Sequence, residues 1–301
     1  MNKSKPARWA GWLWAATLLA ACNAFAEPDR SPDRPISVSP PPATLIAPPA
    51  GTSLPSSTLS PLDTTTSVYP TEWREVHPGV YFRLSSVAVG EWMDRLALLR
   101  IDPARAEFRV RYAPDMPQTV RDWHMQTLIT EGAVAVINAG FFNANNENTG
   151  LLITDGQTHG QSYRGFGGMF FIQEGRPSLI WLAEQPYQPD SHITQAVQSF
   201  PMLVRAGRAL DGVPNSGRPS RRSFVGIDRQ GWVILGVTTM PIWSLTALAD
   251  YLAGASDLAL DSALNLDGGG SAGMWVRGVA DGLLVNSIDP VPAVIVVIPR
   301  R

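Results

Sequence analysis

The residues whose types and spacing best suit chemistry form a glycine-rich run near the end of the chain. Residues 263–266 are largely apolar, which is typical of a buried strand. The run that follows consists of Asp267, Gly268, Gly269, Gly270 and Ser271. Consecutive glycines cost backbone entropy, so they usually lie where the backbone approaches another group closely or adopts positive φ. Backbone N–H groups in such a turn can bind an anion beside Asp267, although a tight turn capped by the aspartate is an equal alternative.

Polar residues also interrupt three other apolar segments. Asn138 follows residues 133–137, Gln198 lies inside 196–204, and Arg222 with Ser223 precedes 224–227. A buried polar group without a partner costs about 1 to 3 kcal/mol, so each side chain needs a partner. Because strand ends are where ligands gather in open α/β sheets, convergence of Asn138 with the glycine-rich run is one hypothesis.

The alternative for these polar residues is structural. The amides of Asn138 and Gln198 can be satisfied by nearby backbone groups. Arg222 has Arg218 and Arg221 as neighbours, so it can equally belong to a solvated basic loop.

The elements that must position these residues are mainly strands. Residues 80–89, 95–101 and 107–112 predict an opening antiparallel meander, and further strands are expected at 133–137, 151–154, 168–172, 178–182, 196–204, 223–227, 233–237 and 294–298. Helices are expected at 119–130, capped by Thr119 and ended by Gly132, and at 244–252, capped by Ser244. The pattern predicts a single α+β domain with a mixed, largely antiparallel sheet and a few helices.

Composition excludes several function classes. The chain has 301 residues and a formal net charge of -2, and beyond residue 26 it carries 21 Arg against 26 acids. A long basic face for nucleic acid is therefore not expected. No lysine occurs after residue 26, so a Schiff-base lysine and a P-loop lysine are excluded from the rest of the chain. Any phosphate held there by a side-chain cation must be held by arginine.

The N-terminal region predicts export. Basic residues precede an apolar stretch at 11–21, which is the pattern of a signal peptide spanning 1–26. Cleavage after Ala26 competes with a lipoprotein-type site at Cys22, the single cysteine of the chain. Residues 27–68 contain 10 Pro and 14 Ser or Thr, so they predict a disordered tether that leads into a domain at 69–301. The expected location is the bacterial periplasm or outer envelope, with a membrane contact only through a lipid on Cys22.

Four segments resemble a known family, the phosphodiester glycosidases. They are Ile137–Phe142, Gln198–Leu203, Arg222–Asp228 and Ala263–Ser271, and they occur in the order typical of the family. The resemblance covers roughly residues 133–298. One departure lies before the Val-Pro of the last strand, where many relatives have an arginine and this chain reads Ile288-Asp289-Pro290-Val291-Pro292.

The resemblance implies hydrolysis of a sugar 1-phosphodiester, as in a GlcNAc-α-1-phosphodiester, to free sugar and phosphomonoester. Phosphate is a good leaving group, so the main need is to bind its charge rather than to protonate it. By this resemblance the catalytic residues are Asp267, Arg222 and Asn138, with Glu147, Asp155 or Asp228 as alternative acids. The expected substrate-binding residues are Gly140, Phe141, Gln198, Ser223, Gly268, Gly269, Gly270 and Ser271.

Other groups of residues give weaker indications of function. The histidines at 77, 124, 159 and 192 lack metal-ligand spacing, so neither a metal nor another cofactor is expected. Three tryptophans could stack on a sugar, namely Trp123, Trp243 and Trp275. A second function remains open, in which the chain is a non-catalytic envelope lipoprotein that binds phosphorylated glycan or exopolysaccharide.

Overall fold

The computed structural model describes residues 72–165, 167–213 and 218–300. The predicted signal peptide (1–26) with Cys22, the predicted tether (27–68) and residues 69–71 lie outside the described residues. No helix in the described ranges is both long and apolar enough to cross a bilayer.

The described strands form three sheets, and each pair of neighbouring strands is antiparallel. The eight-stranded sheet contains, in spatial order, β1 (Arg74–His77), β2 (Val80–Val89), β3 (Trp92–Ile101), β14 (Val233–Thr238), β13 (Ser223–Asp228), β15 (Leu260–Asn265), β11 (Met202–Arg205) and β12 (Arg208–Ala209). The five-stranded sheet contains β7 (Gln157–His159), β6 (Leu152–Thr154), β10 (Ile193–Ser199), β8 (Gly168–Gln173) and β9 (Arg176–Trp181). The four-stranded sheet contains β16 (Met274–Val276), β5 (Ala135–Asn138), β17 (Ala293–Pro299) and β4 (Ala106–Tyr112).

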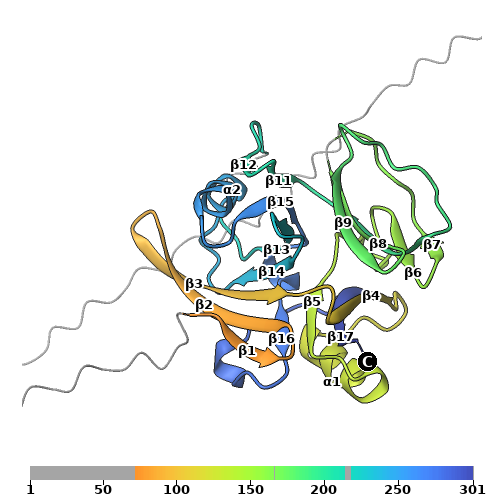
Figure 1. Cartoon of the computed structure of the whole chain (residues 1–301), viewed down its shortest axis with the longest axis horizontal. Coiled ribbons are helices and arrows are strands. Elements are labelled where there is room, and N and C mark those ends of the chain that lie inside the picture. Colours follow the sequence, from red (N-terminus) through yellow and green to blue (C-terminus); the bar gives the residue numbers. More distant parts are fainter. Residues whose placement is uncertain (1–71, 166, 214–217, 301) are drawn as a thin grey trace, which may run out of the picture. The chain divides into compact units, whose positions relative to one another are not determined.

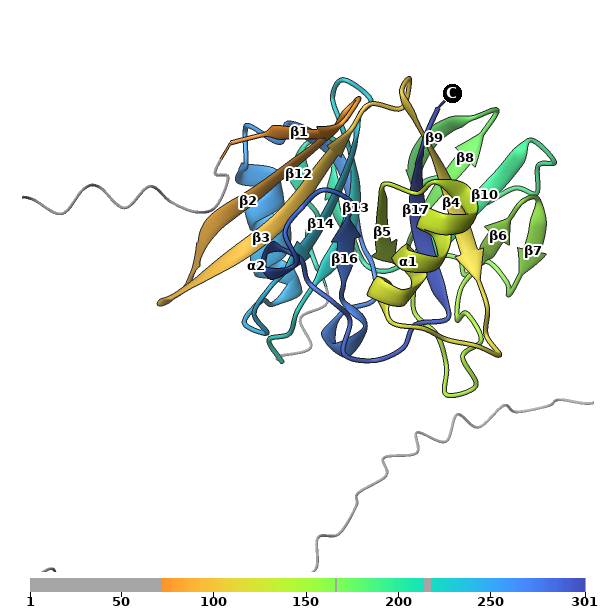
Figure 2. The same ribbon diagram turned by 90° about the horizontal axis from the view of Figure 1, so that it is seen from below.

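The predicted α+β class and the predominance of antiparallel strands are confirmed, with the strands divided among three sheets (Figures 1 and 2). The predicted meander is wrong at its third strand. β2 pairs with β3, but β4 leaves this hairpin and pairs with β17 over residues 106–112. β17 is buried along nearly its whole length, so its backbone groups need a partner strand on each edge, and β4 and β5 supply them.

The core explains why several strands are apolar at every position. Successive side chains of a strand point to opposite faces, and here both faces are covered. In β17, Ile295 and Val297 enter a core shared by all three sheets, whereas Val294 and Val296 enter a separate cluster under α1. The same alternation occurs in β3, β8 and β13, so each sheet contributes one face to the shared core.

Two α-helices cover outer faces, and each begins at the predicted cap. In α1 (Val120–Glu131) the Thr119 hydroxyl accepts from the Asp122 N–H, and Gly132 ends the helix at φ 72°. In α2 (Leu245–Gly254) the Ser244 hydroxyl accepts from the Ala247 N–H. α1 packs on the four-stranded sheet and α2 on the eight-stranded sheet, as Figures 1 and 2 show. Two short 3-10 turns, η1 (Gly269–Ser271) and η2 (Asp281–Leu283), lie in the C-terminal part.

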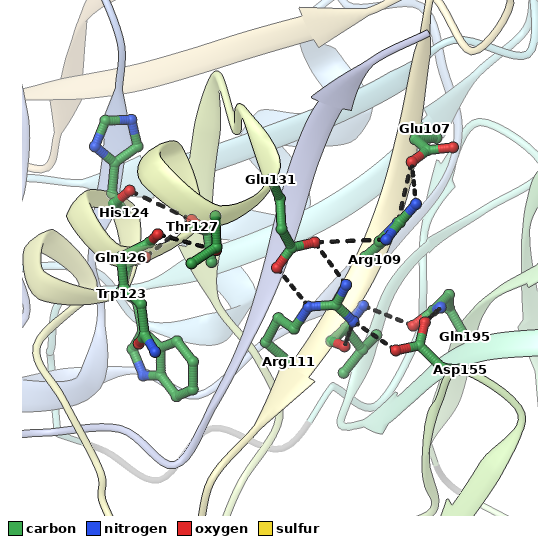
Figure 3. Close-up of polar contacts among 12 residues, drawn as sticks. Glu107, Arg109, Arg111, Trp123, His124, Gln126, Thr127, Glu131, Asp155 and Gln195 are labelled. Atoms are coloured by element: carbon green, nitrogen blue, oxygen red, sulfur yellow. Dashed lines mark hydrogen bonds and ion pairs between the residues drawn. The ribbon is translucent and has the colours of Figure 1, made fainter. Parts of the chain in front are cut away.

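An ion-pair network joins α1 to two of the sheets (Figure 3). Both carboxylate oxygens of Glu131 accept from Arg111, at 2.7 and 2.6 Å, and Arg109 lies 3.6 Å from the same carboxylate. Arg111 also pairs with Asp155, which in turn accepts from the amide of Gln195 on β10. These contacts raise the pKa of Arg111, chiefly through its hydrogen bonds to Glu131. The network therefore fixes the end of α1 and the β6–β7 turn against β4.

His124 on α1 predicts a loss of stability in acid. Its side chain is buried, neither ring nitrogen has a hydrogen-bond partner in the described ranges, and burial, with the charge of Arg277, lowers its pKa to about 4. The unfolded chain binds this proton near pH 6.5, so the free energy of unfolding should fall by about 3 kcal/mol as the pH drops from 6.5 to 4. Urea unfolding of wild type and His124→Leu across this range measures the effect, and the variant should show a shallower fall.

The matched control is His192→Leu. His192 is exposed and hydrogen-bonds Asp190, which raises its pKa, so its contribution to stability grows as the pH falls. In His192→Leu the free energy of unfolding should therefore fall with decreasing pH at least as steeply as in wild type. Equal slopes for wild type and His124→Leu would contradict the assignment of this fall to His124.

Candidate active site

Asn138 joins three strand termini that are far apart in the sequence. Its side-chain Nδ2 donates to the Asp267 carbonyl at 2.7 Å, and its Oδ1 accepts from the Ser223 hydroxyl at 2.7 Å and the Gly273 N–H at 3.1 Å. The Asp267 N–H donates in turn to the Ala139 carbonyl at 3.1 Å. The predicted convergence of Asn138 with the glycine-rich run therefore occurs, where the end of β5 meets the end of β15 and the start of β13.

The same contacts indicate that Asn138 and Ser223 support the structure of the site. Asn138 is 1 % exposed and Ser223 is 0 % exposed, and the contacts of both side chains are internal. Neither side chain points to solvent where a substrate could reach it. Both hold the backbone of Asp267, so they act on the site through that residue's position.

Asp267 is the titratable group at the centre of this junction. Burial raises its pKa to about 6, and the nearby negative charge of Asp289 adds to the rise. Hydrogen bonds from the Ser271 hydroxyl and from the Gly268 N–H, 2.9 Å from Oδ1, act in the opposite direction. A carboxyl group with this pKa can change protonation state near neutral pH, as acid–base catalysis requires.

The glycines of the loop are required by close contacts and by backbone conformation. A Cβ at Gly268 would lie 2.8 Å from the Arg221 carbonyl oxygen, and Gly269 has a φ of 62°. A Cβ at Gly270 would overlap the Asp289 carboxylate, so any side chain at this position would require that exposed carboxylate to move. Close approach of the backbone and positive φ, the two reasons predicted from the sequence, therefore both account for glycines in this loop.

Three of the four backbone N–H groups of the predicted anion cradle, Gly268 to Ser271, are used within the protein. The Gly268 N–H donates to Asp267 Oδ1, the Gly269 N–H to the Arg221 carbonyl, and the Ser271 N–H to the Gly268 carbonyl. The loop folds into the η1 turn, which uses these donors internally. Anion binding at this site therefore depends on side-chain cations rather than on these three N–H groups.

Two arginines lie against the loop. Arg222 donates from Nε to the Trp243 carbonyl at 3.0 Å, and its side chain passes beside Gly268. Arg221 donates to the carbonyl oxygens of Gly269 (3.1 Å) and Gly270 (3.3 Å). Burial lowers the pKa of both, but arginine stays charged at neutral pH, and neither forms an ion pair within the described part of the chain. Such cations can attract a phosphate.

A recess lined by aromatic side chains lies along the same junction. Phe141, which follows the β5 end, stacks on Phe200 with ring centroids 4.2 Å apart, and Tyr163, Thr149 and Gln198 are among the other lining residues. The Phe200 carbonyl accepts from the side-chain amide of Asn265, two residues before Asp267. The recess therefore borders the strand that carries the acid.

Gln198 and Gly140 shape this recess from beneath. Gln198 is 4 % exposed, and its amide group bonds the backbone of Leu151 and Tyr163. A Cβ at Gly140 would lie 2.7 Å from the Gln198 carbonyl oxygen. The Gln198 side chain therefore has its hydrogen-bond partners in nearby backbone groups, which is the structural alternative predicted from the sequence.

The alternative acids have other partners. Asp228 is buried, pairs with Arg100 at 2.7 Å and accepts from two turn N–H groups. Asp155 belongs to the network of Figure 3, and Glu147 accepts from Asn143. Within the described residues, no group of three His, Cys, Asp or Glu side chains could hold a metal ion.

Two of the tryptophans suggested for sugar stacking belong to the core. Trp123 and Trp243 are buried and donate from their indole N–H groups to the Val291 carbonyl and to Asp94. Trp275 is partly exposed, but the Arg121 guanidinium lies over its ring, 5.3 Å from the centroid. Phe141 and Tyr163 are therefore better placed for a sugar than these indoles.

Comparison with known proteins decides the family. The model of the family described as phosphodiester glycosidase matches residues 131–298, more than half of the chain. The chain belongs to the phosphodiester glycosidase family. Every predicted site residue of this phosphodiester glycosidase lies in the matched region, and membership implies a hydrolase.

Two solved structures have a fold similar to that of this chain. The catalytic domain of zebrafish N-acetylglucosamine-1-phosphodiester alpha-N-acetylglucosaminidase, auto-inhibited by its pro-peptide, is 16 % identical with a TM-score of 0.56, over 76 % of this chain and 87 % of that one. A hypothetical protein from Synechocystis is 18 % identical with a TM-score of 0.52, over 78 % of this chain and 64 % of that one. No curated protein sequence matches the chain.

Sequence reasoning did not assign a place in the site to Phe200, Tyr163 or Asp289. Phe200 lies in the segment Gln198–Leu203, two residues after Gln198, so its position in the sequence could have suggested a place in the site. Tyr163 and Asp289 lie in loops without periodic patterning, and only the fold brings them to the junction.

Replacement of Asn138 tests its structural position. In Asn138→Ala the Gly273 N–H, the Ser223 hydroxyl and the Asp267 carbonyl lose a buried partner, so the free energy of unfolding should fall by at least about 2 kcal/mol. Urea unfolding at pH 7 measures the change. Asn145→Ala, at an exposed loop position, is the matched control and should stay within about 0.5 kcal/mol of wild type. A comparably small change in Asn138→Ala would contradict the junction role.

Proposed function

We propose that the chain is an exported hydrolase that cleaves a sugar 1-phosphodiester to free sugar and phosphomonoester. The observation that carries the proposal is a partly buried Asp267, with its pKa near 6, on a loop bordered by two arginines that have no ion pair in the described residues. Membership of the phosphodiester glycosidase family supports the same chemistry.

In the proposed reaction the bond between the sugar C1 and the phosphate oxygen breaks, and water supplies the new oxygen on C1. Asp267, in its carboxylate form, accepts a proton from the attacking water. The phosphomonoester leaves as an anion, so no proton donor is required, and the Arg222 guanidinium stabilises its charge. Arg221 adds positive potential at the same loop.

The sugar is proposed to lie over the outer rim of the aromatic recess, because the recess itself, with a volume of about 10 Å³, is too small to enclose a sugar. Phe141 and Tyr163 offer ring surfaces to the apolar face of a pyranose, and Thr149 offers a hydroxyl. Asn138, Gln198 and Ser223 then support the site through the backbone that they hold. Gly140, Gly268, Gly269 and Gly270 allow the backbone to pack closely enough to form it, and Ser271 orients the carboxyl group.

Export rests on the pattern of residues 1–26, and attachment to the envelope would require a lipid on Cys22. The Pro-rich stretch at 27–68 would then act as the tether of a domain at 69–301. The second candidate function, a lipoprotein that binds phosphorylated glycan without cleaving it, keeps the recess and the arginines but needs no titrating carboxyl group. Asp267 therefore favours the hydrolase.

The test measures sugar release from the methyl phosphodiester of α-GlcNAc 1-phosphate by the full-length chain. Asp267→Asn should lower kcat/KM by about 100-fold or more through loss of the base, and Arg222→Ala by about 100-fold through loss of charge stabilisation. For wild type, kcat/KM should rise with pH through about 6 as Asp267 loses its proton.

The matched controls are Asp281→Asn and Arg176→Ala, which alter exposed residues outside the junction and should retain wild-type rates. Thermal unfolding checks that every variant is folded. If the wild type binds the phosphodiester but releases no sugar from GlcNAc, GalNAc or glucose forms, the lipoprotein function replaces the hydrolase.

A further inference from the structure

A groove with a volume of about 230 Å³ adjoins the glycine-rich loop at Arg221. The Arg221 side chain lines this groove and also donates to the carbonyl oxygens of Gly269 and Gly270, the second and third residues after Asp267. Four apolar side chains and two arginines form most of the lining, namely Leu84, Leu283, Leu284, Val285, Arg95 and Arg221. This leucine–arginine groove therefore shares Arg221 with the proposed active site.

One part of the lining comes from the β2–β3 hairpin, which projects beyond its sheet (Figure 1). β3 pairs with β14 over residues 96–101, whereas residues 92–95 extend past that pairing and remain paired with β2. Residues two apart on a strand share a face, so Arg95 lies on the same face as Ala97 and as Leu84, the cross-strand partner of Ala97. Because Ala97 and Leu84 belong to the shared core, the groove begins where this core reaches the surface.

A second part of the lining is the segment from Leu283 to Asn286. The Val285 carbonyl accepts from the first N–H of β16 at 2.7 Å, and the Asn286 carbonyl accepts from Arg221 at 3.1 Å. Leu283 and Leu284 pack against the shared core while staying partly exposed. This segment is therefore held in place and presents apolar surface to the groove.

The neutral polar side chains of the groove already have partners. The Thr239 hydroxyl donates to Asp94, and the side-chain oxygen of Asn286 accepts from the Arg121 N–H at 3.0 Å. A sugar in the groove would place hydroxyl groups against leucine side chains, and polar groups buried without partners cost free energy. An alkyl chain would instead remove apolar surface from water, so the lining favours an alkyl chain over a sugar.

Arg221 places a positive charge between the groove and the loop. Three of its five N–H donors bond the carbonyl oxygens of Gly269, Gly270 and Asn286, which fixes the guanidinium through neutral partners. The exposed Asp289 acts on this charge through space. Arginine stays charged at neutral pH and binds phosphate strongly. A cation next to leucine side chains is suited to an anion that carries an aliphatic chain.

We infer that the leucine–arginine groove binds the leaving group of the proposed reaction, and that this leaving group is the phosphomonoester of an aliphatic alcohol. The inference rests on the proposed function, because it names the second product of that reaction. Water adds to C1 and gives its proton to Asp267, and the bond from C1 to the phosphate oxygen breaks. The alkyl phosphate then leaves as an anion, with its phosphate toward Arg221 and its chain along Leu283 and Leu284.

The experiment compares three sugar 1-phosphodiesters as substrates of the full-length chain, each with GlcNAc, GalNAc or glucose as the sugar. They are the methyl ester, the hexyl ester and the diethylene glycol ester, whose polar chain matches hexyl in its number of non-hydrogen atoms. A fully buried methylene group improves binding by about fourfold, and part of the lining is open to solvent, so kcat/KM for the hexyl ester should exceed both others by at least about tenfold. Calorimetry with hexyl phosphate and diethylene glycol phosphate should show the same preference in binding.

The variants test whether the groove causes this preference. Leu284→Gln should lower the hexyl-to-methyl ratio of kcat/KM by about fivefold, because it removes apolar contact with the chain, and Leu283→Gln should act in the same direction. The matched control is Ile129→Gln, which makes a similar change at a side chain on α1 that is 80 % exposed, and it should leave the ratio unchanged. Both rates come from one preparation, so a partly unfolded sample cannot change their ratio.

The outcomes separate this inference from the proposed function. Equal rates on the hexyl and diethylene glycol esters, or a hexyl-to-methyl ratio that both leucine variants leave unchanged, would overturn the inference and leave the proposed function intact. Preferential binding of hexyl phosphate that is lost in Leu284→Gln, without sugar release from any ester, would overturn the proposed function and support the groove as an alkyl phosphate site. Equal binding of the two phosphates without any sugar release would overturn both.

Discussion

The side-chain amide of Asn138 is the interaction on which the rest of the site depends. It joins the end of β5 to the loop that follows β15 and to the start of β13, and these elements belong to two different sheets. An amide suits this position because it donates and accepts at once, so it can bond the Asp267 carbonyl and the Ser223 hydroxyl together. Buried polar groups without partners are costly, so the three segments can come together only if these bonds form.

The three-sheet architecture explains where this junction lies. Each sheet contributes one face to a shared apolar core, and helices or loops cover the opposite faces, so most buried side chains of the strands are apolar. The polar groups of the junction lie at strand ends, where the backbone turns and needs hydrogen bonds. The glycine-rich loop is one such end, and its close packing leaves Asp267 partly buried beside Arg221 and Arg222.

Burial and the neighbouring negative charge raise the pKa of Asp267 together, and hydrogen bonds oppose them. Removing the Asp267 carboxyl group from water raises its pKa, and the carboxylate of Asp289 raises it further, whereas hydrogen bonds within the loop limit the rise. The arginines do not neutralise this carboxyl group, because their donors are directed to backbone carbonyl oxygens. The site therefore combines a carboxyl group that can titrate near neutral pH with cations available to an anionic substrate, and both follow from how tightly the loop is packed.

The sequence by itself determined the fold class, the caps Thr119 and Ser244 and the family, because these follow from local periodicity, capping chemistry and short contiguous motifs. It also indicated that Asn138 and Asp267 converge, but it could not divide contact residues from supporting ones. Only the tertiary structure decided that β4 pairs with β17 and that Asp289 covers Gly270. These contacts join residues far apart in the chain, and they arise from satisfying strand edges and packing a loop, which leave no periodic signal in the sequence.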